Sequence, residues 1–343
     1  MSYDIAAHLW QGLAIPAHPL ALDAARKLDP RRQRALTRYY IDAGAGGLAV
    51  GVHTTQFAIR DTGLYEPVLR AAVEATRQWT DRPLALIAGL AGPTEQALAE
   101  ARLASSLGYH AGLLSLAAMR ARHPDAIIEH CAAVACVIPI VGFYLQPAVG
   151  GVHLDAAFWT RFAVIPGVIA IKVAPFNRYR TLDVLRGVVE AGAEKRVALY
   201  TGNDDHIVLD LVTPFIIMRE GLPVTIRFQG GLLGHWSVWT RSAVELLARC
   251  QAAQMPDPTL LALDSRVTDC NSAFFDVAND FRGCIAGCHE VLRRQGLLEG
   301  IWCLDPEEKL SAGQAREIDR VTRAHHDLSD DAFVALNRER WLS

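Results

Sequence analysis

Short apolar runs rich in branched side chains alternate along this chain with segments whose apolar residues recur at a helical period. The candidate strands begin near Leu13, Gly47, Leu84, Ala111, Ile138, Val168, Val197 and Val224. The candidate helices span residues 31–43, 66–79, 95–107, 125–136, 156–162, 182–191 and 207–219. Strands that alternate with helices predict βαβ units and a parallel sheet. Eight such units predict an α/β fold of the (β/α)8 TIM barrel type.

A doubly wound open sheet is the alternative, but no GxGxxG follows the first strand, so a dinucleotide-binding form has little support. Beyond Trp236 the strand pattern stops, and helices are predicted over 242–252, 278–295 and 315–325. We therefore expect residues 1–236 to form the barrel. Residues 237–343 are expected to form a C-terminal helical extension that includes the last barrel helix and could contribute to an oligomer interface.

Composition narrows the class of protein. The chain has 343 residues, 51% of them hydrophobic, and a net charge of only -3. Such a near-neutral balance gives no support for nucleic acid or an anionic membrane surface as partner. We find neither a signal-type N-terminus nor an apolar run long enough for a bilayer, so a cytoplasmic protein is expected. The seven cysteines include no CxxC pair, and Cys284 and Cys288 are interpreted as reduced cysteines on one helix face.

Lys172 stands where a solvated lysine is not expected. The chain has four lysines, and the other three have charged neighbours, whereas Lys172 lies inside the apolar run 168–174. Burial of an ammonium group is costly unless the group is paired or its pKa falls. A lysine with a lowered pKa is a nucleophile that can form a Schiff base with a carbonyl compound. The alternative is a structural lysine that reaches solvent or pairs with a buried carboxylate.

Other polar residues follow the predicted strands, at the ends that meet on one face of a (β/α)8 barrel. These residues are His53, Thr54, Thr55, Tyr144, Gly202, Asp204, Asp205 and His206. A lysine, a phenol and a threonine pair on one face can perform carbonyl chemistry. Each also has a structural interpretation: threonines cap turns, Tyr144 can be a core aromatic, and residues 204–206 can open a helix. For residues 204–206 the structural interpretation is favoured.

Taken together, these segments resemble the dihydrodipicolinate synthase / N-acetylneuraminate lyase family of class I, pyruvate-type aldolases. The resemblance covers roughly residues 10–300 and is carried by five segments in the family's order. They are Gly12-Leu13-Ala14-Ile15-Pro16-Ala17 (first strand), His53-Thr54-Thr55-Gln56-Phe57 (Gly-Thr-Thr-Gly-Glu in the family), Tyr144-Leu145-Gln146-Pro147 (Tyr-Asn-x-Pro), Ile171-Lys172 (Ile-Lys) and Thr201-Gly202-Asn203-Asp204 (Ser-Gly-Asp-Asp).

The resemblance implies a role for each matching residue. Lys172 is implied to form an imine with pyruvate or a longer 2-oxo acid, and Tyr144 to act as the general acid/base. Thr54 and Thr55 are implied to hold the carboxylate of the substrate, and Thr54 could also relay protons to Tyr144. His53 and Gly202 are implied to contact the substrate. The implied partners are a 2-oxo acid and an aldehyde. The implied assembly is a homo-oligomer, a dimer or a tetramer, with no cofactor.

The chain departs from the family pattern at three places, and the losses of the second tyrosine and of the arginine argue against dihydrodipicolinate synthase itself. Gln56-Phe57 replaces Gly-Glu, residues 116–120 lack the synthases' second tyrosine, and Ala148-Val149-Gly150 stands where the synthases carry an arginine. In the eighth strand segment, Arg227 or His235 could meet a distal polar group of the substrate, or Arg227 could form a structural pair.

The sequence therefore predicts a Schiff-base lyase or aldolase for a 2-oxo acid, or a dehydratase that uses the same imine. A catalytically silent barrel that binds a 2-oxo acid is the alternative. A metal-dependent hydrolase is a third hypothesis, and its candidate ligands are His8, His18, His53, Asp204 and His206. The chain has neither a His-x-His motif nor a carboxylate-bridged cluster, so we expect no metal.

Overall fold

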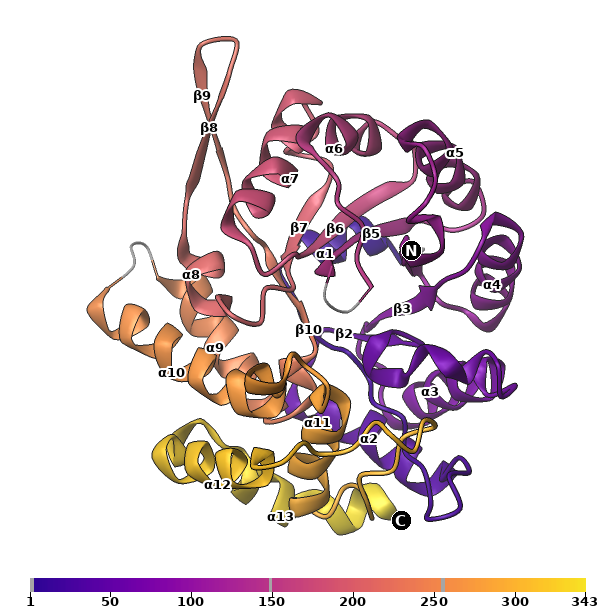
Figure 1. Ribbon diagram of the computed structural model, residues 1–343, viewed down its shortest axis with the longest axis vertical. Helices are drawn as coiled ribbons and strands as arrows, with labels where there is room; N and C mark the ends of the chain where they lie inside the picture. Colours follow the sequence, from indigo (N-terminus) through magenta and orange to yellow (C-terminus); the bar gives the residue numbers. More distant parts are fainter. Residues whose placement is uncertain (1–2, 148–149, 254–256) are drawn as a thin grey trace.

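The computed structural model describes residues 3–147, 150–253 and 257–343 (Figure 1). Eight parallel strands form one sheet in the order β1-β10-β7-β6-β5-β4-β3-β2. They are β1 (Ala14–Pro16), β2 (Gly47–Val50), β3 (Ala85–Leu90), β4 (Ala111–Leu114), β5 (Ile140–Leu145), β6 (Val168–Ala174), β7 (Ala198–Thr201) and β10 (Gly230–Leu233). A parallel bridge between Ala17 and Ala49 joins β1 to β2, with His18 N–H donating to the Ala49 carbonyl over 2.8 Å. The predicted barrel is confirmed.

Helices surround the barrel and cover the outer faces of its strands (Figure 1). They are α2 (Pro30–Ala43), α3 (Tyr65–Trp79), α4 (Thr94–Leu107), α5 (Pro124–Ala135), α6 (Ala156–Ala163), α7 (Arg178–Glu190) and the short α8 (Ile207–Val212). Local chemistry sets their limits: the side chain of Asp29 caps α2, Pro30 occupies its first turn, and Gly44 ends it in a left-handed conformation.

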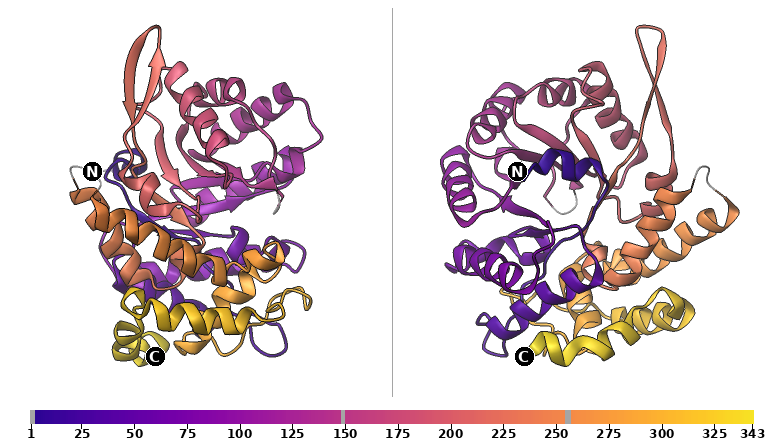
Figure 2. Two further views of the ribbon diagram at one scale, coloured as in Figure 1. Left: turned by 60° about the vertical axis from the view of Figure 1, so that its left-hand side comes forward. Right: turned by 180° about the vertical axis from the view of Figure 1, so that it is seen from behind.

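Apolar side chains fill the barrel interior, and the helix α1 (Ile5–Trp10) lies across its amino-terminal opening (Figure 2, right). Ile5 and Leu9 of α1 belong to the same buried cluster as the inward-facing residues of the strands. The hydroxyl of Tyr200 donates to the Leu9 carbonyl over 2.7 Å and fixes the helix there. The open face of the barrel is therefore the carboxyl-terminal one.

The segment between α8 and β10 differs from the prediction. The predicted helix 207–219 ends at Val212, and an antiparallel hairpin of β8 (Phe215–Arg219) and β9 (Leu222–Ile226) follows and projects past the ring of helices (Figure 1). Pro214 disfavours helical backbone at Thr213. Val224 therefore belongs to the hairpin, and the eighth barrel strand is β10 rather than a strand near Val224.

The C-terminal part is helical, and Figure 1 shows it gathered beside α2. It consists of α9 (Thr240–Ala252), α10 (Pro258–Phe274), α11 (Cys284–Arg294), α12 (Gln314–Ala324) and α13 (Asp331–Leu342). The helical extension is confirmed, although α10 and α13 are absent from the predicted helices and α11 begins later than expected. Single 3-10 turns occur at η1 (His53–Thr55), η2 (Phe57–Ile59), η3 (Ala117–Met119), η5 (His235–Ser237), η6 (Val277–Asn279) and η7 (His326–Leu328). Across the described ranges, no helix is both long and apolar enough to cross a membrane.

Candidate active site

Lys172 lies on the inward face of β6, near its carboxyl end, and is 7% exposed. Its ammonium lies 4.5 Å from the centroid of the Phe143 ring, on the neighbouring strand β5. Glycine at position 202 makes room for the lysine, because a Cβ there would lie 2.6 Å from the Lys172 Cε. Among the described residues, the Lys172 nitrogen has no hydrogen-bond acceptor and no ion-pair partner, so the buried amine is free to react.

Asp204 follows β7 and is the acidic residue that acts most strongly on Lys172. Its side chain is 4% exposed, and one carboxylate oxygen accepts the backbone N–H of His235 over 2.9 Å. Burial raises the pKa of Asp204, and the charge of Lys172 opposes that rise. Burial lowers the pKa of Lys172, and the charge of Asp204 opposes that fall. The two groups thus lie close enough to influence each other without forming a direct ion pair.

The sequence interpretation of Asp204 as part of a helix cap is wrong. Helix α8 begins at Ile207, its capping residue is His206, and no side chain makes a capping hydrogen bond there. Asp204 instead points into the cavity that contains Lys172. The sequence analysis named Asp204 but favoured the structural interpretation, because an Asp-Asp-His run before a helix is typical of caps as well as of sites.

A cavity of about 50 Å³ surrounds the amine of Lys172. Its polar lining consists of His53, Thr54, Gln146, Lys172 and Asp204. The remaining lining is largely apolar: Ala17, Val52, Phe143, Leu145, Ala174, Phe176, Gly202, Gly234, Phe275, Phe281 and Cys284. A cavity of this size holds about two water molecules, so only a small group fits around the amine.

The two predicted threonines differ in position. Thr54 lines the cavity, and its hydroxyl donates to the Ala17 carbonyl over 2.8 Å. Thr55 does not line it: its hydroxyl donates to the His18 carbonyl over 2.6 Å and accepts the backbone N–H groups of Gly51 and Val52. Thr55 thus stabilises the turn after β2, and the structure does not support its predicted contact with a carboxylate.

His53 opens the same turn and also lines the cavity. Burial lowers the pKa of His53 to about 4, and the charge of Lys172 contributes to this shift. The imidazole is therefore neutral at neutral pH. Among the described residues, neither the His53 nor the Thr54 backbone N–H donates to a protein acceptor, as expected for the first donors of a helical turn.

Tyr144 is not among the residues that line the cavity, so the general acid/base role that the resemblance implies stays a prediction that this placement does not support. Its ring packs on Trp159 of α6 with centroids 5.1 Å apart, on the outer side of the barrel. Its hydroxyl donates to the Leu154 carbonyl over 3.0 Å and accepts the Leu154 N–H. The inward-facing residues of this strand are Val141 and Phe143, and Phe143 is the one that pairs with Lys172 in the sheet.

Arg227 is also outside the site. It precedes β10, so it lies toward the amino-terminal end of the barrel; its side chain is exposed and donates to the Val212 carbonyl. His235 contributes only its backbone N–H to the site through Asp204, and its ring lines a different cavity. Ala148 and Val149, where the synthases carry an arginine, lie outside the described residues.

Of the five candidate metal ligands, His53 and Asp204 line the Lys172 cavity and the other three lie elsewhere. The ring of His18 is buried between the Pro19 carbonyl and Thr37, His8 contacts Tyr3, and His206 lies near Asp264. Within the ranges that the structure describes, no group of three or more His, Cys, Asp or Glu side chains is placed to hold a metal ion. The placement of these side chains therefore gives no support to the metal-dependent hydrolase hypothesis.

Three residues of the lining come from beyond the barrel and were not predicted. Phe275, Phe281 and Cys284 belong to the C-terminal extension, so the extension helps to build the cavity. Phe281 contacts Phe176 edge-to-face with centroids 5.9 Å apart, and both have positive φ angles. Such strained conformations are typical of residues held by a functional site.

The comparisons with known proteins agree with this architecture. The profile of the Dihydrodipicolinate synthetase family matches residues 13–213, which is more than half of the chain. The chain therefore belongs to the dihydrodipicolinate synthetase family. No curated protein matches its sequence.

Several solved structures share the fold at low sequence identity. Dihydrodipicolinate synthase from Acinetobacter baumannii, complexed with pyruvate, has a TM-score of 0.74 and 16% identity, over 91% of this chain and 98% of that one. N-acetylneuraminate lyase from Fusobacterium nucleatum has a TM-score of 0.73 and 14% identity, over 92% and 99%. YagE, a prophage protein from E. coli K12 in complex with pyruvate, has a TM-score of 0.74 and 17% identity, over 90% and 97%. At these identities the likeness concerns the fold.

Proposed function

We propose that the protein is a class I lyase that acts on a 2-oxo acid through an imine at Lys172. The observation that carries the proposal is the buried, unpaired amine of Lys172 in a small cavity beside Asp204. An amine with a lowered pKa is partly neutral near neutral pH, and the neutral amine is the nucleophile. The chain belongs to the dihydrodipicolinate synthetase family, and a structurally similar dihydrodipicolinate synthase was solved with pyruvate bound; both facts support imine chemistry on a 2-oxo acid.

The cleavage reaction proceeds as follows on a 4-hydroxy-2-oxo acid. The Lys172 amine adds to C2, and loss of water gives a protonated imine. Asp204 accepts the proton of the C4 hydroxyl, the C3–C4 bond breaks, and its electron pair moves into the imine to form an enamine. C4 leaves as an aldehyde, a proton returns to C3, and hydrolysis releases pyruvate and the free amine. Aldol condensation is the reverse sequence.

Asp204 takes the proton-transfer role because it is the ionisable group in the cavity best matched to it. Because its pKa is raised toward neutral pH, the carboxyl group of Asp204 can both accept and return a proton there. The Tyr144 hydroxyl, by contrast, is outside the cavity. The carboxylate of the 2-oxo acid is held by the free backbone N–H groups of His53 and Thr54, with the Gln146 amide nearby.

Borohydride trapping tests the imine. The protein is incubated with pyruvate and borohydride and its intact mass is measured, alongside Lys172→Ala. We expect a reduced pyruvate adduct on the native protein and none on the variant. No adduct with pyruvate or any larger 2-oxo acid would refute the proposal.

A silent barrel that binds a 2-oxo acid is the second candidate, favoured by the position of Tyr144 outside the cavity. Turnover across a panel of 4-hydroxy-2-oxo acids separates the two. We expect turnover, with Asp204→Asn reducing it by about 100-fold or more while adduct formation persists. An adduct without turnover on any member of the panel would favour the silent barrel.

A further inference from the structure

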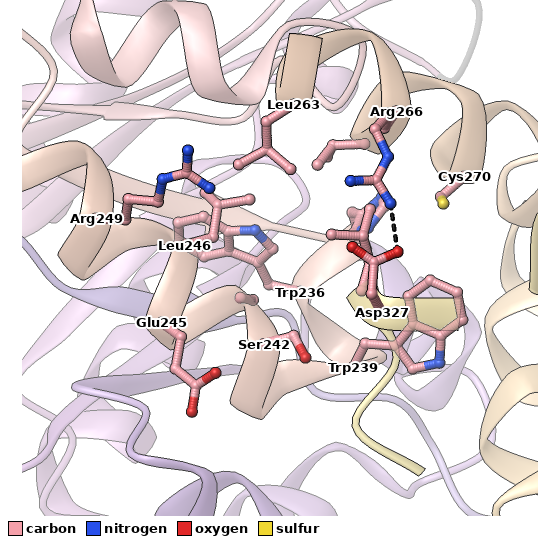
Figure 3. Close-up of a pocket in the computed structure, with 14 residues that line it drawn as sticks. Trp236, Trp239, Ser242, Glu245, Leu246, Arg249, Leu263, Arg266, Cys270 and Asp327 are labelled. Carbon is pink, nitrogen blue, oxygen red and sulfur yellow. Dashed lines mark hydrogen bonds and ion pairs between the residues drawn. The ribbon is translucent and has the colours of Figure 1, made fainter. Parts of the chain in front are cut away.

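A second cavity, of about 250 Å³, lies between α9 and α10 and is five times as large as the one around Lys172. Apolar side chains form about half of its wall: Trp236, Trp239, Ala243, Leu246, Leu263, Val267 and Leu328. Figure 3 shows Arg249 on one side of this cavity and the Arg266–Asp327 ion pair on the other, with Trp236 between them. Apolar walls with a few polar groups are typical of small-molecule sites.

The charges of the cavity leave one cation without a carboxylate partner. Asp327 pairs with Arg266, and Glu245 accepts a 2.7 Å hydrogen bond from Arg241. Arg249 donates to the hydroxyl of Thr259 and, among the described residues, forms no ion pair. The nearby carboxylate of Asp257 accepts hydrogen bonds from Thr259 and from the first N–H groups of α10, and it interacts with the charge of Arg249 without forming a direct ion pair. The cavity therefore offers one guanidinium for a ligand anion.

Trp236 offers a second group. The residue is 1% exposed, and among the described residues its indole N–H donates to no protein acceptor. In Figure 3 this nitrogen faces the side of the cavity on which Arg249 lies. Trp239 adds an aromatic wall, held edge-to-face on Phe274 at 5.0 Å by a backbone with φ of 51°.

We infer that this cavity binds a monocarboxylate with an apolar body, its carboxylate held by Arg249 and the Trp236 N–H and its body packed against the two tryptophans. Arg249 suits this role because guanidinium groups bind carboxylates in a planar, bidentate geometry. Uncharged analogues of the same shape are rejected, because they leave the guanidinium without its anion.

The site is also coupled to Asp204. Trp236 lies in the single turn His235–Ser237, and the first backbone N–H of this turn is the donor that holds Asp204. A ligand that contacts Trp236, and the Asp204 carboxylate that accepts the His235 N–H, therefore both act on the same backbone turn. Occupancy of either site changes the affinity of the other, and the coupling is reciprocal.

The binding test uses intrinsic tryptophan fluorescence of the full chain, titrated with 4-methylpentanoate and with 4-methylpentanamide, the uncharged analogue. We expect saturable binding of the acid and at least about tenfold weaker binding of the amide. Arg249→Gln should weaken binding of the acid to the level of the amide. Arg316 is exposed and lies away from the cavity, so Arg316→Gln should leave binding of the acid unchanged. Ser242→Trp, which fills the cavity, should abolish both.

Two results would overturn the inference. One is the absence of saturation by the acid up to about 10 mM, a concentration range in which even weak specific binding is measurable. The other is binding that Arg249→Gln leaves unchanged. Coupling is tested by the same titration in Asp204→Asn, where we expect a Kd altered at least about threefold; an unchanged Kd refutes the coupling. These readouts are binding alone, so failure of the proposed lyase activity would not be mistaken for failure of this site.

Discussion

Lys172 and Asp204 owe their chemistry to where the barrel places them. Burial destabilises the charged form of each group, and each charge stabilises the other, so neither keeps its ordinary pKa. An ordinary surface lysine would be protonated at neutral pH and inactive as a nucleophile. The cavity thus gives the amine of Lys172 surroundings that an ordinary surface lysine lacks.

The rate of pyruvate trapping should depend on pH accordingly. Only the neutral amine reacts, so the rate should rise with pH and reach half its maximum below 10.5, the ordinary pKa of lysine. The charge of Asp204 raises the pKa of Lys172, so Asp204→Asn should move the midpoint to a lower pH. Trapping rates measured from pH 6 to 11 on both proteins check this, and a shift in the opposite direction would contradict the assigned coupling.

Tyr144 allows a sharp test of the structure against the family resemblance. Its hydroxyl bonds only to the backbone of Leu154, so Tyr144→Phe should cost about 1 kcal/mol of unfolding free energy. Trapping and turnover should fall less than about tenfold. A loss of 100-fold or more, typical of a missing general acid/base, would show that this tyrosine takes part in proton transfer.

Among the elements, the β8–β9 hairpin departs most from the sequence prediction. Its turn places Glu220 and Gly221 at φ angles of 51° and 78°, and two positive φ angles are typical of a type I′ turn. Glycine adopts such angles readily, but glutamate does so at a cost. The turn is therefore strained at one position.

Glu220→Asn should relieve this strain, because asparagine tolerates the left-handed region and Asn-Gly is the preferred type I′ pair. We expect the unfolding free energy to rise by about 0.5–1 kcal/mol in urea titrations. Glu220→Ala is the control, since alanine lacks the tolerance of asparagine. Equal stabilisation by both variants would mean that the loss of the charge, not backbone strain, is responsible.

On the scale of the whole molecule, the C-terminal extension and the barrel form one packed unit. Helix α13 packs against α2, and Trp341, which is fully buried, donates its indole N–H to Asp42 over 2.6 Å. The Tyr39 hydroxyl of α2 donates to Asp330 over 2.7 Å. Because the extension also supplies Phe275, Phe281 and Cys284 to the Lys172 cavity, its docking affects the site.

Trp341→Ala should therefore destabilise the whole protein, by about 3–5 kcal/mol for a buried tryptophan. Thermal unfolding followed by circular dichroism measures this, and Leu336→Ala, whose side chain is 86% exposed on the same helix, should change stability by less than about 0.5 kcal/mol. A local effect confined to α13, with the main transition unchanged, would contradict a single cooperative unit. The predicted homo-oligomer stays a prediction, which light scattering tests.

Much of the fold and part of the site followed from local pattern. The strand and helix periods predicted the barrel, and the apolar run around Lys172 singled out the amine of the proposed imine without any structure. His53, Thr54 and Gly202 were found because residues after parallel strands meet on one face. The hairpin was missed because β-branched residues after Thr213-Pro214 also fit a helical period when no turn is recognised.

Tertiary structure alone decided which side chains enter the cavity. A shift of one residue reverses the two faces of a strand, and the register of β5 on β6, irregular at Ile140/Val141, opposes Phe143 rather than Tyr144 to Lys172. Asp204, likewise, becomes part of the site only because β10 brings the His235 N–H to it. Composition and period thus determined the barrel and its lysine. The orientation of a side chain depends on contacts between strands far apart in the chain, and these exist only once the barrel has closed.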